Sequence, residues 1–342
     1  MIASGSTTFS SHKADGAAGE RYAAAILTCA LCAQAANSTL QEDGKKLDLK
    51  ISLLNAFSAH KSIVSVHAQI KHGNSYARQS PGRITLQNLG NETVPTLQDG
   101  TQPALIIWVP PWPNREIYWH IIRPKGKHRS PIKIAEGDIV TPGLRFELSR
   151  FANFERRNPR YPSLDIRQIT GEPTSRANAK MNYAKLKKES LSNPLLGNIL
   201  VTRLAWRHIT RFSRTTDRRL RSFHILEYLR VFLEKVPTRY LVDRKPSCEK
   251  DGLMLERSEI VFWYANAFHM GQEAQTLLIR FIEEVEYPQN WRERPLSEKD
   301  VTHKVTLMSW WFKPQKSGAS LFHTDDRITR QQATVGSSVT LP

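Results

Sequence analysis

Cysteine is scarce in this sequence, which has only three: Cys29, Cys32 and Cys248. An odd and sparse set is not typical of a disulfide framework, so the sequence favours a reducing environment and a cytoplasmic location. Cys29 and Cys32 form a C-x-x-C pair, but no second pair stands at the spacing of a zinc ribbon. We expect two small buried side chains on a helix there, with a metal or redox role as the alternative.

Long apolar runs are also missing. No segment approaches the roughly 20 apolar residues that a membrane-spanning helix needs, so no membrane partner is expected. The apolar stretch 23–36 follows Lys13 and Arg21 and ends in small residues, which leaves a secretion signal as an alternative. The polar residues before it, including Asp15 and Glu20, make a poor start for a signal peptide.

Acidic residues are outnumbered, because 32 Asp and Glu stand against 49 Lys and Arg and leave a formal net charge of +17. Such an excess attracts phosphate polymers through long-range steering and counterion release. Nucleic acid is therefore the expected partner. The alternative is a basic soluble protein that binds none.

The length of 342 residues suits two domains, since single cores stop growing at roughly 250–300 residues, with one compact domain as the alternative. Composition and pattern divide the chain into a disordered tail (1–15), an α/β domain (16–152), a linker rich in Pro, Gly and polar residues (153–180), a mainly helical basic domain (181–316) and a second disordered tail (317–342).

The α/β domain begins with a helical pattern from Asp15 to Gln34. Leu47–Leu53 and Ile63–Lys71 alternate with period two, so each predicted strand has one apolar and one polar face. Ala104–Val109 is apolar throughout, as expected of a strand buried on both faces. The remaining elements are two strands, predicted at Glu116–Ile122 and Ile132–Ile134, and a helix or turn near Leu144–Phe151 that closes the domain.

Beyond the linker the pattern is helical. Thr216–Val236 places apolar side chains on one side and charged ones on the other, and Ile260–Val285 is a second long helical candidate. Met308–Phe312 is an aromatic cluster, which we interpret as core or as a protein interface, with base stacking as a third reading.

Two predicted strands carry residues that suit phosphodiester hydrolysis. Alternation puts Asp48 on the polar face of one strand, and Gln69 and Lys71 on the polar face of the next. Carboxylate and amide oxygens can hold a hard cation, Mg²⁺ or Mn²⁺, and a lysine can orient or deprotonate the attacking water. The alternative is a solvated glutamine and lysine on an exposed strand.

Three segments carry a family resemblance: Glu20 in the opening helix, Gly44–Leu49 entering a strand, and Val66–Lys71 with its Gln-x-Lys. Over residues 16–152 the chain resembles the PD-(D/E)xK, or restriction-endonuclease-like, superfamily, and more narrowly the uncharacterised Mrr-like domains of bacterial defence proteins. The resemblance implies a restriction-endonuclease-like core, with a helix, a central mixed sheet and a helix, followed here by the mainly helical domain.

The resemblance also implies roles for individual residues. Asp48, Gln69 and Glu20 would hold the metal ion, and Lys71 would act with them in catalysis. Gln69 departs from the acidic residue that is usual at its position, which removes one negative charge that Glu20 would supply. His67 shares a strand face with Gln69 and is a candidate auxiliary residue, whereas Asp43 is the alternative to Asp48.

Arginines crowd the region between residues 203 and 230, with aromatic residues among them. The planar guanidinium suits phosphate oxygens, and aromatic faces can stack on exposed bases. We take the candidate nucleic-acid-binding residues to be Arg207, Arg211, Arg214, Arg218, Arg219 and Arg221. A solvated helix face over an aromatic core is the alternative. His208, His224 and His269 lack metal-site spacing and are expected to be structural.

The sequence thus predicts a cytoplasmic endonuclease, a magnesium-dependent hydrolase of phosphodiester bonds that prefers DNA to RNA. A role in antiviral defence follows from the resemblance alone. Two rival hypotheses remain, a catalytically inactive module that binds nucleic acid and an interaction subunit of a defence complex. A homodimer and a partner within such a complex stay open.

Overall fold

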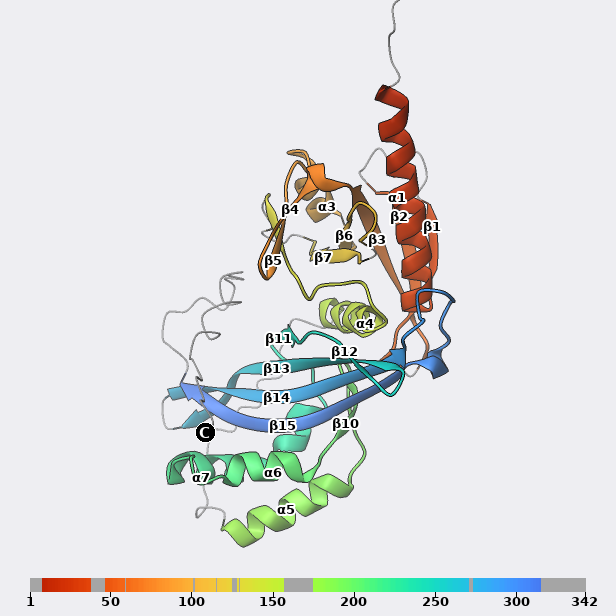
Figure 1. The fold of residues 1–342 in the computed structure, drawn as a ribbon. Coiled ribbons are helices and arrows are strands. Elements are labelled where there is room, and N and C mark those ends of the chain that lie inside the picture. Colours follow the sequence, from red (N-terminus) through yellow and green to blue (C-terminus); the bar gives the residue numbers. More distant parts are fainter. Residues whose placement is uncertain are drawn as a thin grey trace, which may run out of the picture.

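A computed structural model describes residues 8–37, 47–58, 60–100, 102–114, 116–124, 128, 130–156, 175–270 and 273–314. The fold is mixed α/β, with sheets of five, seven and three strands. Figure 1 shows the N-terminal sheet and its helices on one side of the long C-terminal strands, and a group of helices on the other side.

The five-stranded sheet forms the centre of the N-terminal part. Its order is β1-β2-β3-β6-β7, and only β3 and β6 are parallel. The strands are β1 (Gln34–Asn37), β2 (Leu49–Leu54), β3 (Ile63–His72), β6 (Ala104–Val109) and β7 (Tyr118–Ile122). Helices α1 (Thr8–Leu31) and α4 (Leu144–Glu155) contribute to the core on one face of the sheet.

Burial confirms the predicted faces of the first strand from Leu49 onward, but Leu47 precedes β2 and packs against the cluster on the other face of the sheet. Leu49, Ile51 and Leu53 of β2 are buried against the α1 side, and the residues between them are not. Every residue of β6 is buried, as its continuous apolar run predicts. Period-two alternation therefore separates an apolar face under α1 from a mixed face on the other side.

That mixed face is covered in part by a smaller layer. Its three strands are β4 (Ala77–Ser80), β5 (Arg83–Leu86) and β8 (Ile132–Ala135), with α3 (Thr93–Asp99) and the short helix η1 (Asn74–Tyr76) beside them. Ile106 and Trp108 of β6 are buried beneath this layer, together with Tyr118 of β7.

The C-terminal part is built on a seven-stranded sheet, ordered β11-β13-β14-β15-β10-β9 with β12 paired to β13. Its strands are β9 (Leu191–Asn193), β10 (Gly197–Leu200), β11 (Arg239–Arg244), β12 (Cys248–Lys250), β13 (Leu253–Met270), β14 (Glu273–Pro288) and β15 (Thr302–Pro314). Helices α5 (Arg176–Lys188), α6 (Arg203–Thr210), α7 (Thr216–His224) and α8 (Leu229–Leu233) pack on it.

The prediction of a mainly helical C-terminal domain is wrong. Ile260–Val285 lies in the antiparallel strands β13 and β14 rather than in a helix. Ile260, Phe262 and Tyr264 alternate along β13, and such β-branched and aromatic residues favour a pleated, half-buried surface. The helical prediction for Thr216–Val236 is confirmed by α7 and α8, which the one-turn helix η2 (Ile225–Glu227) joins.

The predicted boundaries change as well. α1 begins at Thr8, so the expected tail at 1–15 is wrong for residues 8–15. α4 extends to Glu155 and α5 begins at Arg176, inside the expected linker. The rest of that linker, 157–174, and the expected tail 317–342 lie outside the described residues.

The two parts share a hydrophobic core. Val285 and Tyr287 of β14, with Trp291 after it, are buried in the same cluster as Leu27 of α1 and Ile51 of β2. Trp310 of β15 is fully buried in the cluster under α5–α8, which confirms the core reading of Met308–Phe312 for this residue.

Candidate functional site

Asp48, Gln69 and Lys71 lie on one face of the N-terminal sheet. Leu49 of β2 pairs with Ala68 of β3, so the register places Asp48 opposite Gln69. Lys71 follows two residues later on the same face of β3. This is the face that Ile106 and Trp108 share, not the face under α1.

Asp48 and Gln69 are in direct contact. The side-chain Nε2 of Gln69 donates a hydrogen bond to Oδ2 of Asp48 at 2.5 Å, and the backbone N–H of Ile70 donates to the same oxygen at 2.5 Å. Nε2 of Gln69 also lies 3.4 Å from the backbone oxygen of Ile70. One amide group is thus held between two oxygen acceptors.

The other end of the Gln69 amide is different. Gln69 is 4% exposed, and its Oε1 is buried with no hydrogen-bond partner among the described residues. Leaving a buried acceptor unsatisfied costs about 1–3 kcal/mol. Because amide oxygen and nitrogen occupy equivalent positions, a half-turn of this group would point Oε1 at Asp48 and Ile70.

Lys71 and His67 are half-buried on the same face. The Nζ of Lys71 lies 5.4 Å from the centre of the Tyr76 ring, within the range of a cation–π contact. His67 pairs with Lys50 across β2 and β3, two residues along the strands from the Asp48–Gln69 pair. Asp43, the alternative carboxylate, lies outside the described residues.

Glu20 lies near the C-terminal end of β3, on the opposite face of the sheet from Asp48. It follows Gly19 in α1, and a Cβ on Gly19 would lie 2.6 Å from the Cβ of His72 at the end of β3. The half-buried Glu20 therefore sits by the end of β3 that carries Lys71, but on the α1 side. To share an ion with Asp48, the Glu20 carboxylate would have to reach past the end of β3 to the other face of the sheet.

The donor set suits a magnesium ion only with help from solvent and substrate. Among the described residues, no group of three or more His, Cys, Asp or Glu side chains could hold a metal. Asp48, Oε1 of Gln69 and the backbone oxygen of Ile70 supply oxygen donors alone. Mg²⁺ prefers such donors and keeps several waters while using one or two carboxylates and substrate phosphates. The residues therefore fit this ion.

His120 was missed by the sequence analysis. The pairing register places it in line with Gln69 across the sheet, with Ile106 of β6 between them. Burial, the nearby His128 and Arg123 lower the pKa of His120 to about 4, so its imidazole is neutral at pH 7. The available signal was its spacing, because His120 lies two residues from both Tyr118 and Ile122 and so shares their strand face.

The candidate nucleic-acid-binding arginines gather on α6, α7 and the loop between them. Arg207, Arg211 and Arg218 are exposed, whereas Arg214, Arg219 and Arg221 are partly buried. Arg221 pairs with Asp217 at 3.0 Å. Figure 1 shows α6 and α7 on the side of the C-terminal sheet away from β2 and β3.

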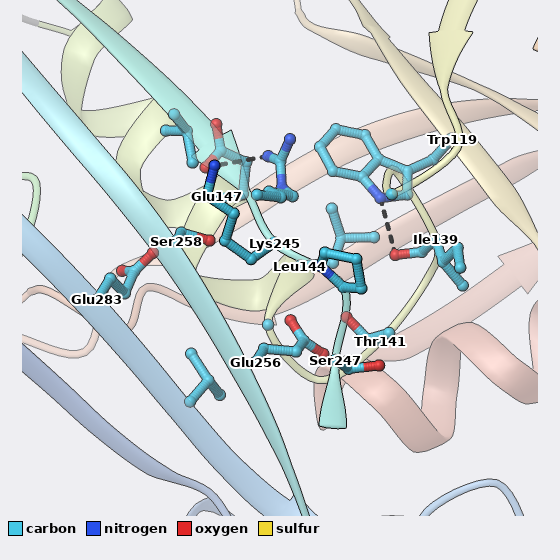
Figure 2. A pocket seen from close by; sticks show the side chains of 16 residues that line it. Trp119, Ile139, Thr141, Leu144, Glu147, Lys245, Ser247, Glu256, Ser258 and Glu283 are labelled. Atoms are coloured by element: carbon cyan, nitrogen blue, oxygen red, sulfur yellow. Dashed lines mark hydrogen bonds and ion pairs between the residues drawn. The ribbon is translucent and has the colours of Figure 1, made fainter. Parts of the chain in front are cut away.

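A pocket of about 70 Å³ lies where the N-terminal part meets the C-terminal sheet. Glu147, Glu256 and Glu283 reach it from α4, β13 and β14 (Figure 2). Arg244 of β11 binds Asp138 at 2.6 Å and Glu147 at 3.4 Å. The fully buried Arg150 of α4 pairs with Glu147 and Glu283.

The surroundings shift the pKa values of two of these glutamates in opposite directions. Burial favours the neutral form of Glu283, but Arg150 and His303 outweigh it and lower the pKa of this carboxyl. Burial raises the pKa of Glu256, which accepts a hydrogen bond from Tyr287 at 2.5 Å. A Cβ on Gly143, at the start of α4, would lie 2.2 Å from Oε2 of Glu256. The arrangement ties β13 to the start of α4.

Comparisons with family models, curated proteins and solved structures found no match to this chain. Among the helices of the described segments, none is long and apolar enough to cross a membrane.

Proposed function

We propose that this protein is a metal-dependent nuclease that hydrolyses phosphodiester bonds, with DNA as the preferred substrate. The observation that supports it is the contact between Asp48 and Gln69 across β2 and β3, with Lys71 on the same face. The proposal requires these three side chains to share one side of the sheet. A net charge of +17 adds an attraction for phosphate polymers.

Each residue has a distinct role in this proposal. Asp48 and Oε1 of Gln69 would hold Mg²⁺ or Mn²⁺, with Glu20 as a third ligand if its side chain reaches the same point. The ion would polarise the scissile phosphate and stabilise the charge that develops on it. Lys71 would orient the attacking water, accept or relay its proton, and offset the added negative charge.

The test is a cleavage assay with purified protein on plasmid, linear DNA and RNA, with Mg²⁺, with Mn²⁺ or with EDTA. Asp48→Asn and Lys71→Met should each reduce the cleavage rate by at least about 100-fold, because each removes a group needed for the proton transfer or the charge stabilisation. Lys133→Met, on the exposed face of β8, is the matched control and should cleave normally.

Absence of cleavage on every substrate with either metal would contradict the proposal. Equal cleavage by wild type and Asp48→Asn would point to a contaminating nuclease. Preference for RNA would retain the chemistry and correct the substrate.

A catalytically inactive binding module is the second candidate. One observation favours it: Gln69 already donates to Asp48, so this carboxylate has a hydrogen-bond partner without an ion. This module would bind DNA equally with and without Mg²⁺ and would leave it intact. A role in antiviral defence, a homodimer and a defence-complex partner remain proposals that derive from the family resemblance.

A further inference from the structure

Phe212 is the most exposed large apolar side chain of the described residues, at 95%. It lies in the loop between α6 and α7, two residues after the end of α6 at Thr210. Leaving a phenyl ring in water forgoes the hydrophobic stabilisation that its burial would give. A single exposed ring is ordinary, but this one stands among arginines.

The loop that carries Phe212 is held in place at both ends. The backbone N–H of Arg214 donates to the oxygen of Arg211 at 3.1 Å, which closes a turn around Phe212. Thr215 caps α7 by accepting from the N–H of Arg218. The guanidinium of Arg214 reaches Ser222 at 3.2 Å, so the loop is fastened to α7. The ring is therefore presented on a preorganised turn.

Positive charge around this loop is not neutralised within the described part of the chain. Arg207, Arg211 and Arg218 are exposed there and make no ion pair with a described carboxylate. Burial, with the charges of Arg211 and Arg218, lowers the pKa of Arg214. The pKa of His208 is lowered by partial burial and by Arg211 and Arg214. A polyanion bound here would relieve this mutual repulsion.

A hollow of about 100 Å³ opens beside the loop. Its apolar floor is formed by Leu220 and Phe223, and its rim by Thr210, Thr216 and two arginines, Arg176 and Arg219. Apolar floor and hydrogen-bonding rim together suit a flat, polar-edged group such as a nucleotide base.

We infer that the face formed by α6, α7 and their loop binds an unpaired strand of nucleic acid, with Phe212 stacking on a base and the neighbouring arginines contacting phosphates. This inference rests on the proposed function in taking nucleic acid as the substrate, and it adds the strand form that the protein recognises. A phenyl ring reaches a base face in a duplex only by unstacking neighbouring base pairs, whereas the bases of an unpaired strand are already accessible, so the exposed ring favours an unpaired strand.

The test measures binding in EDTA, so that no cleavage takes place. A fluorescein-labelled oligothymidylate of about 20 nucleotides, long enough to cover such a face, is compared by fluorescence anisotropy with a blunt-ended duplex of the same length. The wild type should bind the single strand more tightly. Phe212→Ala should weaken that binding about 5- to 100-fold, the loss expected for one stacked base.

Matched variants separate stacking from general effects. Phe212→Tyr should bind like the wild type and Phe212→Leu like Phe212→Ala, since only an aromatic ring stacks. Arg211→Gln and Arg218→Gln should each lower the slope of log K against log salt by about 0.7. Arg230→Gln, whose arginine pairs with Glu234, and Ile63→Ala, which removes an exposed apolar side chain elsewhere, should change neither quantity.

Unchanged binding by Phe212→Ala, or tighter binding of the duplex than of the single strand, would overturn the inference. Either result could occur in a protein that cleaves DNA through Asp48, so the nuclease proposal would survive it. Conversely, if the wild type cleaves no substrate while Phe212→Ala abolishes single-strand binding, the result would support this inference and contradict the nuclease proposal.

Discussion

Gln69 occupies a position where a second carboxylate would repel Asp48. Its Nε2 lies 2.5 Å from the Asp48 carboxylate, and an acidic residue in the same place would bring two negative charges into contact. The neutral amide therefore stabilises the site in the absence of a cation. It also supplies less negative charge than a carboxylate would for binding a cation.

Gln69→Glu should make the stability of the protein depend on Mg²⁺. In EDTA we expect the unfolding temperature to fall by several degrees, because the two carboxylates repel each other in a buried place. Millimolar Mg²⁺ should restore it, since an ion between them turns repulsion into shared coordination. Scanning fluorimetry measures both. Gln79→Glu, on exposed β4, should respond to neither condition. No recovery with Mg²⁺ would count against an ion site at Asp48.

Glu256→Gln should stabilise the protein at high pH but not at low pH. Burial raises the pKa of Glu256, so the folded state resists its ionisation. The stability linked to this group is present below the unfolded pKa and is lost as pH rises through the folded pKa. Glutamine stays neutral, so the unfolding temperatures should coincide near pH 4 and diverge by pH 8. A constant difference across the range would contradict this reading.

The sequence predicts site residues where the geometry is local. Asp48, Gln69 and Lys71 share a face because alternation along two adjacent strands fixes it. The pairing of Arg150 with Glu283 could not be predicted, since the two residues are 133 positions apart and meet only through packing. Nor does any local pattern show that the N–H of Ile70 points at Asp48.

At the level of elements, α1 depends on a close approach at Gly19. Gly19→Ala should lower the free energy of unfolding by about 1–3 kcal/mol, because its methyl group would meet the Cβ of His72 at 2.6 Å and push α1 from β3. Chemical denaturation measures the change.

Gly16 offers a control within the same helix. A Cβ there meets nothing within 4 Å. Gly16→Ala should therefore be neutral or stabilise by about 0.5–1 kcal/mol, as expected for alanine in an exposed helix. Equal effects of the two substitutions would show that helix propensity alone decides them.

Elements were predictable where the pattern has one period. The strands β2, β3 and β6 follow from alternation or a continuous apolar run, whereas the segment of α4 is predicted only as a helix or a turn. β13 and β14 were taken for a helix because apolar residues are so dense over 260–285 that both periods find matches. The partner strand β15, which decides between them, lies farther along the chain.

For the whole molecule, the shared core means that the two parts should stay together without a covalent link. The chain can be produced as two co-expressed fragments, residues 1–156 and 157–342. We expect the two fragments to co-elute in gel filtration, because Val285, Tyr287 and Trp291 are buried against α1 and β2. Separate elution without denaturant would contradict a common core.

The N-terminal sheet also fixes the orientation of the Asp48 site. At the other end of β3, the backbone oxygen of Ile63 accepts a hydrogen bond from Arg156, which directly follows α4, and Phe57 contacts His303 of β15. Lys71 and Asp48 therefore lie at the end that points away from the C-terminal sheet (Figure 1). The α6–α7 face lies on the far side of that sheet.

A nucleic-acid strand bound at Phe212 would therefore have to extend along the protein before one of its phosphodiester bonds could lie at Lys71. Short oligonucleotides would occupy one place or the other, whereas a long strand held at one end would raise the local concentration of its own distant phosphates at the other. If the protein cleaves such a strand, its turnover would rise with substrate length and level off once the strand spans the distance between the two places.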